Sequence, residues 1–302
     1  MLDLATLAAL HEKYREAVSS PVADFALGRQ RFDFSRERYL MGVVNLSADS
    51  WYRESVVLNA DAAIRRGRVL REQGAAIVDV GAESSLAHAV RVDGEAQAGM
   101  LLPVVRGLAQ AGVCVSVETY HPSVTTACLK AGAQILNLTG TTRSEEMFRE
   151  VADYEAGVII CFVQGDNVRE VGDLELGRDP VGAMYEFFAR QIEAATDAGV
   201  SRIWIDPGLG FYYRNLQDSA TRVRHQMDVF LNSFRLRQLG WPICQALPHA
   251  FECFEDEVRA AEPFFAVLAL LGQAGLLRTH EVAKVRGVLR AMQCGGETVP
   301  IS

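Results

Sequence analysis

Several polar side chains directly follow short apolar runs, and two of them are carboxylates. Asp206 ends the run at 203–205 and precedes a proline and a Gly-rich segment, while Glu118 and Asn137 follow two earlier runs. A carboxylate can accept two parallel N–H bonds from a 2-aminopyrimidinone edge, and an amide can pair with the other ring atoms. If the three meet in one pocket, they suit a flat nitrogen heterocycle. The alternative for Asp206 is a local role in capping or turning the chain.

Two basic side chains follow the last apolar run. Arg278 and His280 suit a phosphate or diphosphate, because a guanidinium can bond two anionic oxygens at once. Together with the first group, they would hold a heterocycle that carries a diphosphate leaving group. The alternative for His280 is a satisfied polar group at a barrel rim. The other polar residues at the ends of such runs are Asn45, Asp79, Glu83, Ser84, Ser85, Thr119, Thr139, Gln164 and Gln245.

The chain repeats one pattern in which a helical stretch stops at a glycine and a buried strand follows. Glycine at a helix end adopts the left-handed conformation that turns the chain back toward a sheet. With the first apolar run at 40–46, the pattern makes eight strand–helix units across 40–293, which predicts an α/β fold of the (β/α)8 TIM barrel type. A doubly wound open sheet is the alternative, but no G-x-G-x-x-G follows the first strand. The glycines are Gly74, Gly112, Gly132, Gly157, Gly199, Gly240 and Gly275.

The barrel is expected to occupy residues 39–302, with residues 1–38 as an N-terminal extension. Within the extension, 5–18 predicts a short amphipathic helix, and the charged segment 25–38 predicts irregular structure. The connection 163–179 is long and polar, which predicts a mobile loop over the barrel mouth. Chemistry in such barrels collects at the carboxyl ends of the strands, so the polar residues above are predicted to share one face.

Composition narrows the class of partner. A net charge of -8 over 302 residues argues against nucleic acid or an anionic membrane as the main partner. The sequence contains no 18-residue apolar run, so no transmembrane helix is predicted. The first residues also lack the basic start of a signal peptide, so we expect a cytoplasmic protein. The six cysteines form no C-x-x-C pair. This predicts reduced, mostly buried thiols and disfavours a zinc site.

Taken together, the motifs resemble those of dihydropteroate synthase, the pterin-binding barrel of folate biosynthesis. No single motif is decisive, but they fall in order across nearly the whole chain. They are M-G-V-V-N-L-S-A-D-S (41–50), G-A-A-I-V-D-V-G-A-E-S-S (74–85), V-S-V-E-T-Y (115–120), A-G-A-Q-I-L-N (131–137), I-D-P-G-L-G-F (205–211) and L-R-T-H-E-V (277–282).

The resemblance implies a transferase that joins 6-hydroxymethyl-7,8-dihydropterin diphosphate to 4-aminobenzoate or a related amine and releases pyrophosphate. It implies Mg²⁺ as the cofactor and a homodimer formed by helices near the C-terminal end. Phe264–Leu271 is apolar enough for that interface, although the barrel core is the alternative for most of it. The implied roles are pterin binding by Glu118, Asn137 and Asp206, Mg²⁺ and diphosphate binding by Asn45, diphosphate binding by Arg278 and His280, and a place for Ser85 in the second loop near the diphosphate and the amine.

The sequence departs from the family pattern mainly on the amine side. Leu86 stands where the family has an arginine, Leu138 where it has an acid, and Glu118 where it usually has the shorter aspartate. After the seventh strand, residues 248–251 replace S-R-K-S, so a lysine is missing and His249 is its only partial substitute. The departures leave two alternatives to a synthase. These are a catalytically silent pterin-binding homologue or accessory subunit and, less favoured, a methyltetrahydrofolate methyltransferase.

Overall fold

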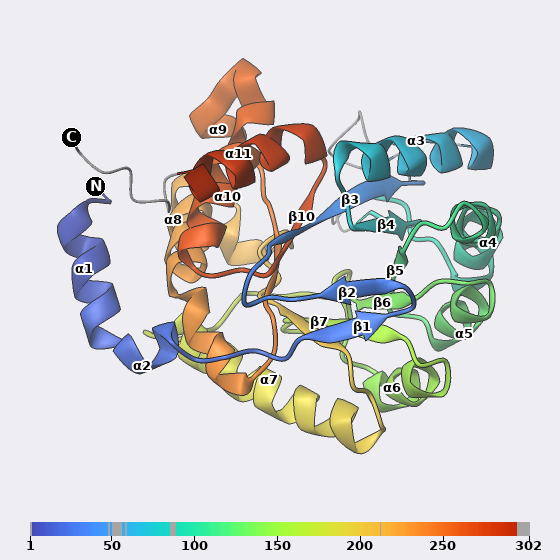
Figure 1. The fold of residues 1–302 in the computed structure, drawn as a ribbon, viewed down its shortest axis with the longest axis horizontal. Helices are drawn as coiled ribbons and strands as arrows, with labels where there is room; N and C mark the ends of the chain where they lie inside the picture. The colour runs from blue at the N-terminus through green and yellow to red at the C-terminus, as the bar shows by residue number, and fades with distance from the viewer. Residues whose placement is uncertain are drawn as a thin grey trace.

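Eight parallel strands form a barrel that one short bridge closes (Figure 1). Neighbouring strands pair in the order β8-β7-β6-β5-β4-β3-β10-β9, and a parallel bridge between Ile205 and Ile243 joins the two ends. The (β/α)8 barrel predicted from the sequence is therefore confirmed. The strands are β3 (Tyr39–Asn45), β4 (Ile77–Gly81), β5 (Val115–Thr119), β6 (Ile135–Leu138), β7 (Gly157–Cys161), β8 (Ile203–Asp206), β9 (Cys244–Ala246) and β10 (Leu276–Thr279).

The structure is a computed structural model that describes residues 2–47, 49, 56–57, 59–84, 89–211 and 213–294. Ser85, which the sequence placed near the diphosphate and the amine, lies outside the described residues, as does Leu86.

Helices cover the outside of the barrel (Figure 1). Five of the described helices begin at a side-chain cap, since Asp3, Asn59, Asp93, Asp179 and Asp218 each accept a hydrogen bond from the backbone N–H three residues later. Such caps satisfy N–H groups that a helix start leaves unpaired. The helices are α1 (Leu4–Lys13), α2 (Arg15–Val18), α3 (Ala60–Gln73), α4 (Gly94–Gln110), α5 (Pro122–Lys130), α6 (Ser144–Asp153), α7 (Pro180–Asp197), α8 (Ser219–Asn232), α9 (Phe251–Phe254), α10 (Ala261–Leu271) and α11 (Val282–Cys294), with 3₁₀ turns at η2 (Arg214–Leu216), η3 (Ser233–Leu239) and η4 (Glu255–Ala260).

The N-terminal extension contains a β-hairpin where the sequence predicted irregular structure, so that prediction was wrong. β1 (Phe25–Leu27) and β2 (Gln30–Phe32) pair antiparallel. Phe32 and Phe34 are fully buried and pack edge-on against Trp204, with ring centroids 5.3 and 6.3 Å apart. The hairpin thereby fills the amino end of the barrel with aromatic rings. Each strand is only three residues long and lies among charged residues, so the sequence shows no clear alternation of apolar and polar side chains there. The helix predicted over 5–18 is present as α1 and α2.

Glycines at the helix ends divide into two kinds. Five adopt the expected left-handed φ, namely Gly74, Gly112, Gly132, Gly199 and Gly240. Gly157 and Gly275 do not, and Glu155 and Gln273 take the left-handed position before them, with φ of 49° and 60°. A Cβ on Gly157 would lie 3.0 Å from the Trp204 ring, and one on Gly275 would lie 2.7 Å from the Phe34 ring. These two glycines therefore permit close packing against the aromatic cluster, and the left-handed role predicted for them was wrong.

The cysteines are free thiols, as the sequence predicted. Cys128, Cys161 and Cys244 are buried and Cys114 is partly buried, whereas Cys253 and Cys294 are exposed. Within the described ranges, the helices are too short or too polar to cross a membrane.

The hairpin is predicted to carry a measurable share of the stability of the barrel. Phe32→Ala should lower the free energy of unfolding by about 3–5 kcal/mol, because it empties a ring-sized space that the surroundings only partly refill. Urea denaturation measures the loss. Arg31→Ala, at an exposed position of the same strand, is the control and should change the free energy by less than about 0.5 kcal/mol. Equal effects of the two substitutions would mean that the hairpin does not share the barrel core.

Candidate functional site

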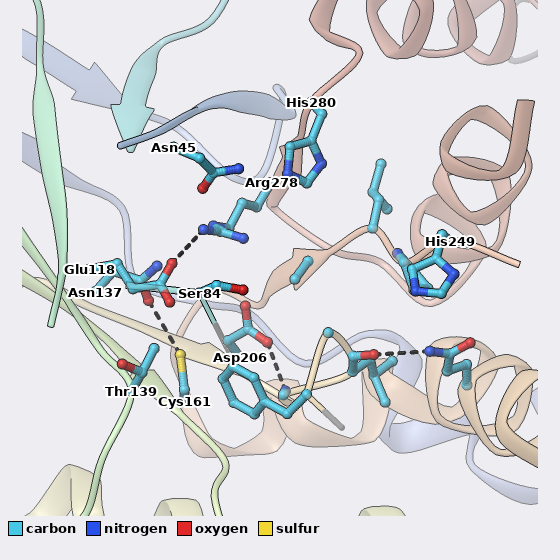
Figure 2. A pocket seen from close by; sticks show the side chains of 18 of the residues that line it. Asn45, Ser84, Glu118, Asn137, Thr139, Cys161, Asp206, His249, Arg278 and His280 are labelled. Carbon is cyan, nitrogen blue, oxygen red and sulfur yellow. Dashed lines mark hydrogen bonds and ion pairs between the residues drawn. The ribbon is translucent and has the colours of Figure 1, made fainter. Parts of the chain in front are cut away.

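A pocket opens at the carboxyl ends of the barrel strands. Figure 2 shows Glu118, Asn137 and Asp206 gathered on one side of it, with Arg278 reaching toward them. Polar residues from distant parts of the chain meet here, as the barrel prediction required. Those that line the pocket are Asn45, Glu83, Ser84, Glu118, Asn137, Thr139, Asp206, Arg222, Gln226, His249, Arg278 and His280.

Four of the described strand-end residues from the sequence analysis do not line the pocket, namely Asp79, Thr119, Gln164 and Gln245. Gln164 exchanges hydrogen bonds with the backbone of Glu175, inside the connection that follows β7. Gln245 is fully buried on β9, between Cys244, which hydrogen-bonds Asp206, and Ala246, which lines the pocket. Because side chains alternate along a strand, Gln245 points away from the barrel interior.

Asp79 is the centre of the polar network under the pocket. It is completely buried, and it accepts hydrogen bonds from Ser116 Oγ (2.7 Å), Asn137 Nδ2 (3.1 Å) and Arg278 Nε (2.8 Å). Asp79 is therefore paired internally and does not face the pocket. These contacts join β4 to β5, β6 and β10, so the carboxylate of Asp79 fixes side chains from three other strands.

The Asp79 network sets the orientation of the pocket-facing groups. Arg278 spans two carboxylates, since its second terminal nitrogen lies 2.5 Å from Glu118 Oε2. Asn137 donates to Asp79 through its amide nitrogen and accepts from Cys161 Sγ at 3.3 Å through its amide oxygen. These two contacts fix the orientation of the amide. A ligand therefore meets side chains whose positions are already determined.

Three carboxylates and one guanidinium give the site an excess of negative charge. Burial raises the pKa of Glu118 to about 7, and Arg278 only partly opposes this shift. Burial likewise raises the pKa of Asp206 to about 6, although Asp206 Oδ1 accepts a hydrogen bond from the Gly208 N–H at 2.8 Å. Burial opposes the charge on Arg278, but Asp79 and Glu118 together hold its pKa above the usual value. Ring N–H donors placed against these acids would favour their charged forms.

His280 is held by a carboxylate that the sequence analysis missed. Glu262 of α10 is 2% exposed, and its Oε1 lies 2.6 Å from His280 Nδ1. Its other oxygen accepts from the backbone N–H groups of His280 and Glu281 and from the Thr279 hydroxyl. The signal in the sequence was an acid at the start of the otherwise apolar stretch 261–271, but its partner lies on another element.

His249 lies on the side of the pocket away from Glu118 and Asn137 (Figure 2). Its ring packs against Phe251, with the centroids 3.9 Å apart. Burial, together with the nearby charge of Arg222, lowers the pKa of His249 to about 4. His249 is therefore a neutral imidazole at neutral pH and does not reproduce the charge of a lysine.

The connection between β7 and α7 reaches across the mouth to the loop after β4, the position that the sequence predicted for it. Arg169 donates to the backbone oxygens of Ser84 (2.9 Å) and Ala89 (2.6 Å) and faces Glu83. Glu83 also accepts from the Tyr120 hydroxyl at 2.6 Å and from the Val92 N–H. Arg169 thus links two loops that border the pocket.

The pocket offers little to a metal on its own. Among the residues described, no group of three or more His, Cys, Asp and Glu side chains is arranged to hold a metal ion. Asn45, the predicted Mg²⁺ ligand, lines the pocket and brings one amide oxygen. Mg²⁺ commonly keeps several waters and takes the rest of its oxygens from a bound phosphate. The residues therefore suit Mg²⁺ only as a companion of a diphosphate.

Comparisons with known proteins agree with this geometry. A family model described as pterin binding enzyme matches residues 41–244. Dihydropteroate synthase from Synechocystis sp. is 27% identical over 226 residues, which cover 72% of this chain and 73% of that protein. The folate synthesis bifunctional protein of Arabidopsis thaliana is 30% identical over 224 residues, but the match spans only 44% of its length. Xanthomonas albilineans dihydropteroate synthase, solved with 4-aminobenzoic acid, has a TM-score of 0.73 at 29% identity, covering 88% of this chain and 95% of that one.

Loss of the proton from Asp206 is predicted to make the folded protein less stable as the pH rises. An acid with a higher pKa folded than unfolded binds more protons in the folded state, so its contribution is complete below about pH 4 and is lost as the pH passes through about 6. Each pKa unit is worth about 1.4 kcal/mol, so the loss should be on the order of 3 kcal/mol. Urea denaturation from pH 4 to 8 measures it, with Asp206→Asn as the comparison that lacks the titrating group. Parallel pH profiles for the two proteins would refute the assignment.

Proposed function

The chain belongs to the pterin-binding enzyme family, and from that premise we propose that it acts as a dihydropteroate synthase in folate biosynthesis. Its substrates would be 6-hydroxymethyl-7,8-dihydropterin diphosphate and an aromatic amine, 4-aminobenzoate or a relative of it. The observation that carries the proposal is the convergence of Glu118, Asn137 and Asp206 on a pocket that also holds Arg278 and His280. A relative from Xanthomonas albilineans was solved with 7,8-dihydropteroate, the product of this reaction.

In the proposed reaction, the bond between the pterin methylene carbon and the diphosphate oxygen breaks, and pyrophosphate leaves with the electron pair. The amine nitrogen then forms the new bond to carbon with its lone pair and loses a proton. No side-chain nucleophile is needed. Catalysis would come from stabilising the departing negative charge and from excluding water.

The residues divide this work by position. Asp206 and Glu118 would accept ring N–H bonds and Asn137 would pair with the remaining ring atoms. Arg278 already uses Nε and one terminal nitrogen on Asp79 and Glu118, and its other N–H groups would bind the diphosphate. His280, held by Glu262 through Nδ1, would present its other nitrogen to the same group. Mg²⁺ bound by Asn45 and the diphosphate would neutralise the leaving charge.

A binding-only role is the second candidate, and a specific observation favours it. Ala250, which stands where the family lysine was expected, is 1% exposed, and the neighbouring His249 is neutral. Neither of these two residues therefore supplies the positive charge of that lysine. Expression of the gene in a strain that lacks its own synthase separates the candidates, because growth without added folate products requires turnover.

We include a homodimer and a cytoplasmic location in the proposal. Within α10, Phe265 and Leu268 belong to the core, whereas Phe264 and Leu271 are 39% and 41% exposed. These two exposed side chains are suited to a contact with a second copy of the chain, and the buried ones follow the core alternative that the sequence left open. Light scattering on Phe264→Ser would report the loss of a dimer.

Asp206→Asn is predicted to weaken pterin binding by about 1–3 kcal/mol, because an amide can no longer accept two ring N–H bonds as a carboxylate does. Titration calorimetry with the pterin diphosphate and Mg²⁺ measures the change. Asp197→Asn, at an exposed position near the end of α7, is the matched control. An affinity equal to that of the parent protein would remove Asp206 from the pterin floor, and undetectable binding to the parent at high micromolar ligand would count against the proposed function itself.

A further inference from the structure

Helix α8 places two buried polar side chains on the pocket wall. Arg222 and Gln226 lie one helical turn apart, and both line the pocket although they are only 8% and 4% exposed. They lie on the His249 side, since the charge of Arg222 acts on that imidazole. Figure 2 shows His249 well apart from Glu118 and Asn137. The two α8 residues therefore belong to the end of the pocket opposite the proposed pterin floor.

Each of these side chains has one polar atom without a hydrogen bond to any residue that the structure describes. The atoms are Arg222 Nε, a donor, and Gln226 Oε1, an acceptor. The assignment of the amide is fixed, because Gln226 Nε2 donates to the Leu209 backbone oxygen at 3.0 Å. A buried polar atom that stays unpaired costs about 1–3 kcal/mol. Both residues line the pocket, so a ligand that draws these two atoms toward it would pair a donor and an acceptor that the fold leaves unsatisfied.

The charge of Arg222 is already compensated. A terminal nitrogen lies 3.1 and 3.3 Å from the two oxygens of Glu252, and the other makes long contacts of 3.5 Å to the backbone oxygens of Leu216 and Gln217. A purely structural tie between α8 and α9 would use these terminal nitrogens alone. It would not account for Nε and Gln226 Oε1.

We propose that Arg222 and Gln226 form the subsite for the far end of the amine substrate, and that they select a carboxamide over a bare carboxylate. The inference rests on the proposed function, because it assumes that an aromatic amine is the second substrate. A carboxamide oxygen accepts from Arg222 Nε, and its N–H donates to Gln226 Oε1. A carboxylate has no donor for Gln226 and brings a second negative charge beside Glu252.

The test compares 4-aminobenzamide with 4-aminobenzoate, which differ only in this group. Calorimetry gives the dissociation constant of each, on the protein alone and on protein loaded with pterin diphosphate and Mg²⁺. The parent protein should bind the amide at least about tenfold more tightly. Gln226→Met, which keeps the volume and removes the acceptor, should bring the ratio close to one. Arg222→Met should weaken the amide, and Arg224→Leu, at an exposed position of α8, should leave the ratio unchanged.

Several outcomes would overturn the subsite. These are tighter binding of 4-aminobenzoate, binding of neither compound, or a ratio that survives both Gln226→Met and Arg222→Met. Circular dichroism establishes that the variants are folded, and Glu252→Gln supplies a milder change in which Arg222 stays in place and the carboxylate should gain affinity. Pterin binding without amide selectivity counts against the subsite alone, whereas amide selectivity without pterin binding counts against the proposed function alone.

Discussion

The buried pair of Asp79 and Arg278 is the interaction on which the candidate site depends. Asp79 lies on β4 with no exposure, and Arg278 reaches it from β10 while touching Glu118 on β5. Removing Arg278 would leave the buried Asp79 carboxylate without its ion-pair partner, which is among the costliest defects in a protein interior. The same pair positions Asn137, which donates to Asp79. At its carboxyl end the barrel interior is thus held by charge, whereas deeper strand residues such as Ile77, Ile135 and Leu276 form an apolar cluster.

The two ends of the barrel are built by different physical means. At the amino end, Phe32, Phe34 and Trp204 close the interior with rings and contain few polar atoms. At the carboxyl end, acids, amides and one guanidinium take the place of those rings. An apolar plug below gives the polar network a dry surrounding, and burial in that surrounding raises the pKa values of Glu118 and Asp206.

The pocket also has two chemically different sides. One side combines carboxylates with Arg278 and His280, and suits a heterocycle with an anionic tail. The other side contains neutral His249 and the Arg222–Glu252 pair, which carries little net charge. The departures from the family pattern that the sequence exposed at 248–251 fall on this second side. The side with Glu118, Asn137 and Asp206 keeps most of its polar groups, although Glu118 and Leu138 also depart from the family pattern.

The sequence by itself determined the barrel and most of the polar residues that gather on one side of the pocket. Apolar runs that end in a polar residue define parallel strands, and parallel strands place their carboxyl ends on one face, so Glu118, Asn137, Asp206, Arg278 and His280 could be grouped without coordinates. Tertiary structure alone decided the partners. Asp79 as the network centre, Glu262 behind His280, and Arg222 beside Gln226 all depend on contacts between elements far apart in the chain. Local patterns report which face a residue takes, but a hydrogen-bond partner on another element is fixed only when the whole barrel packs.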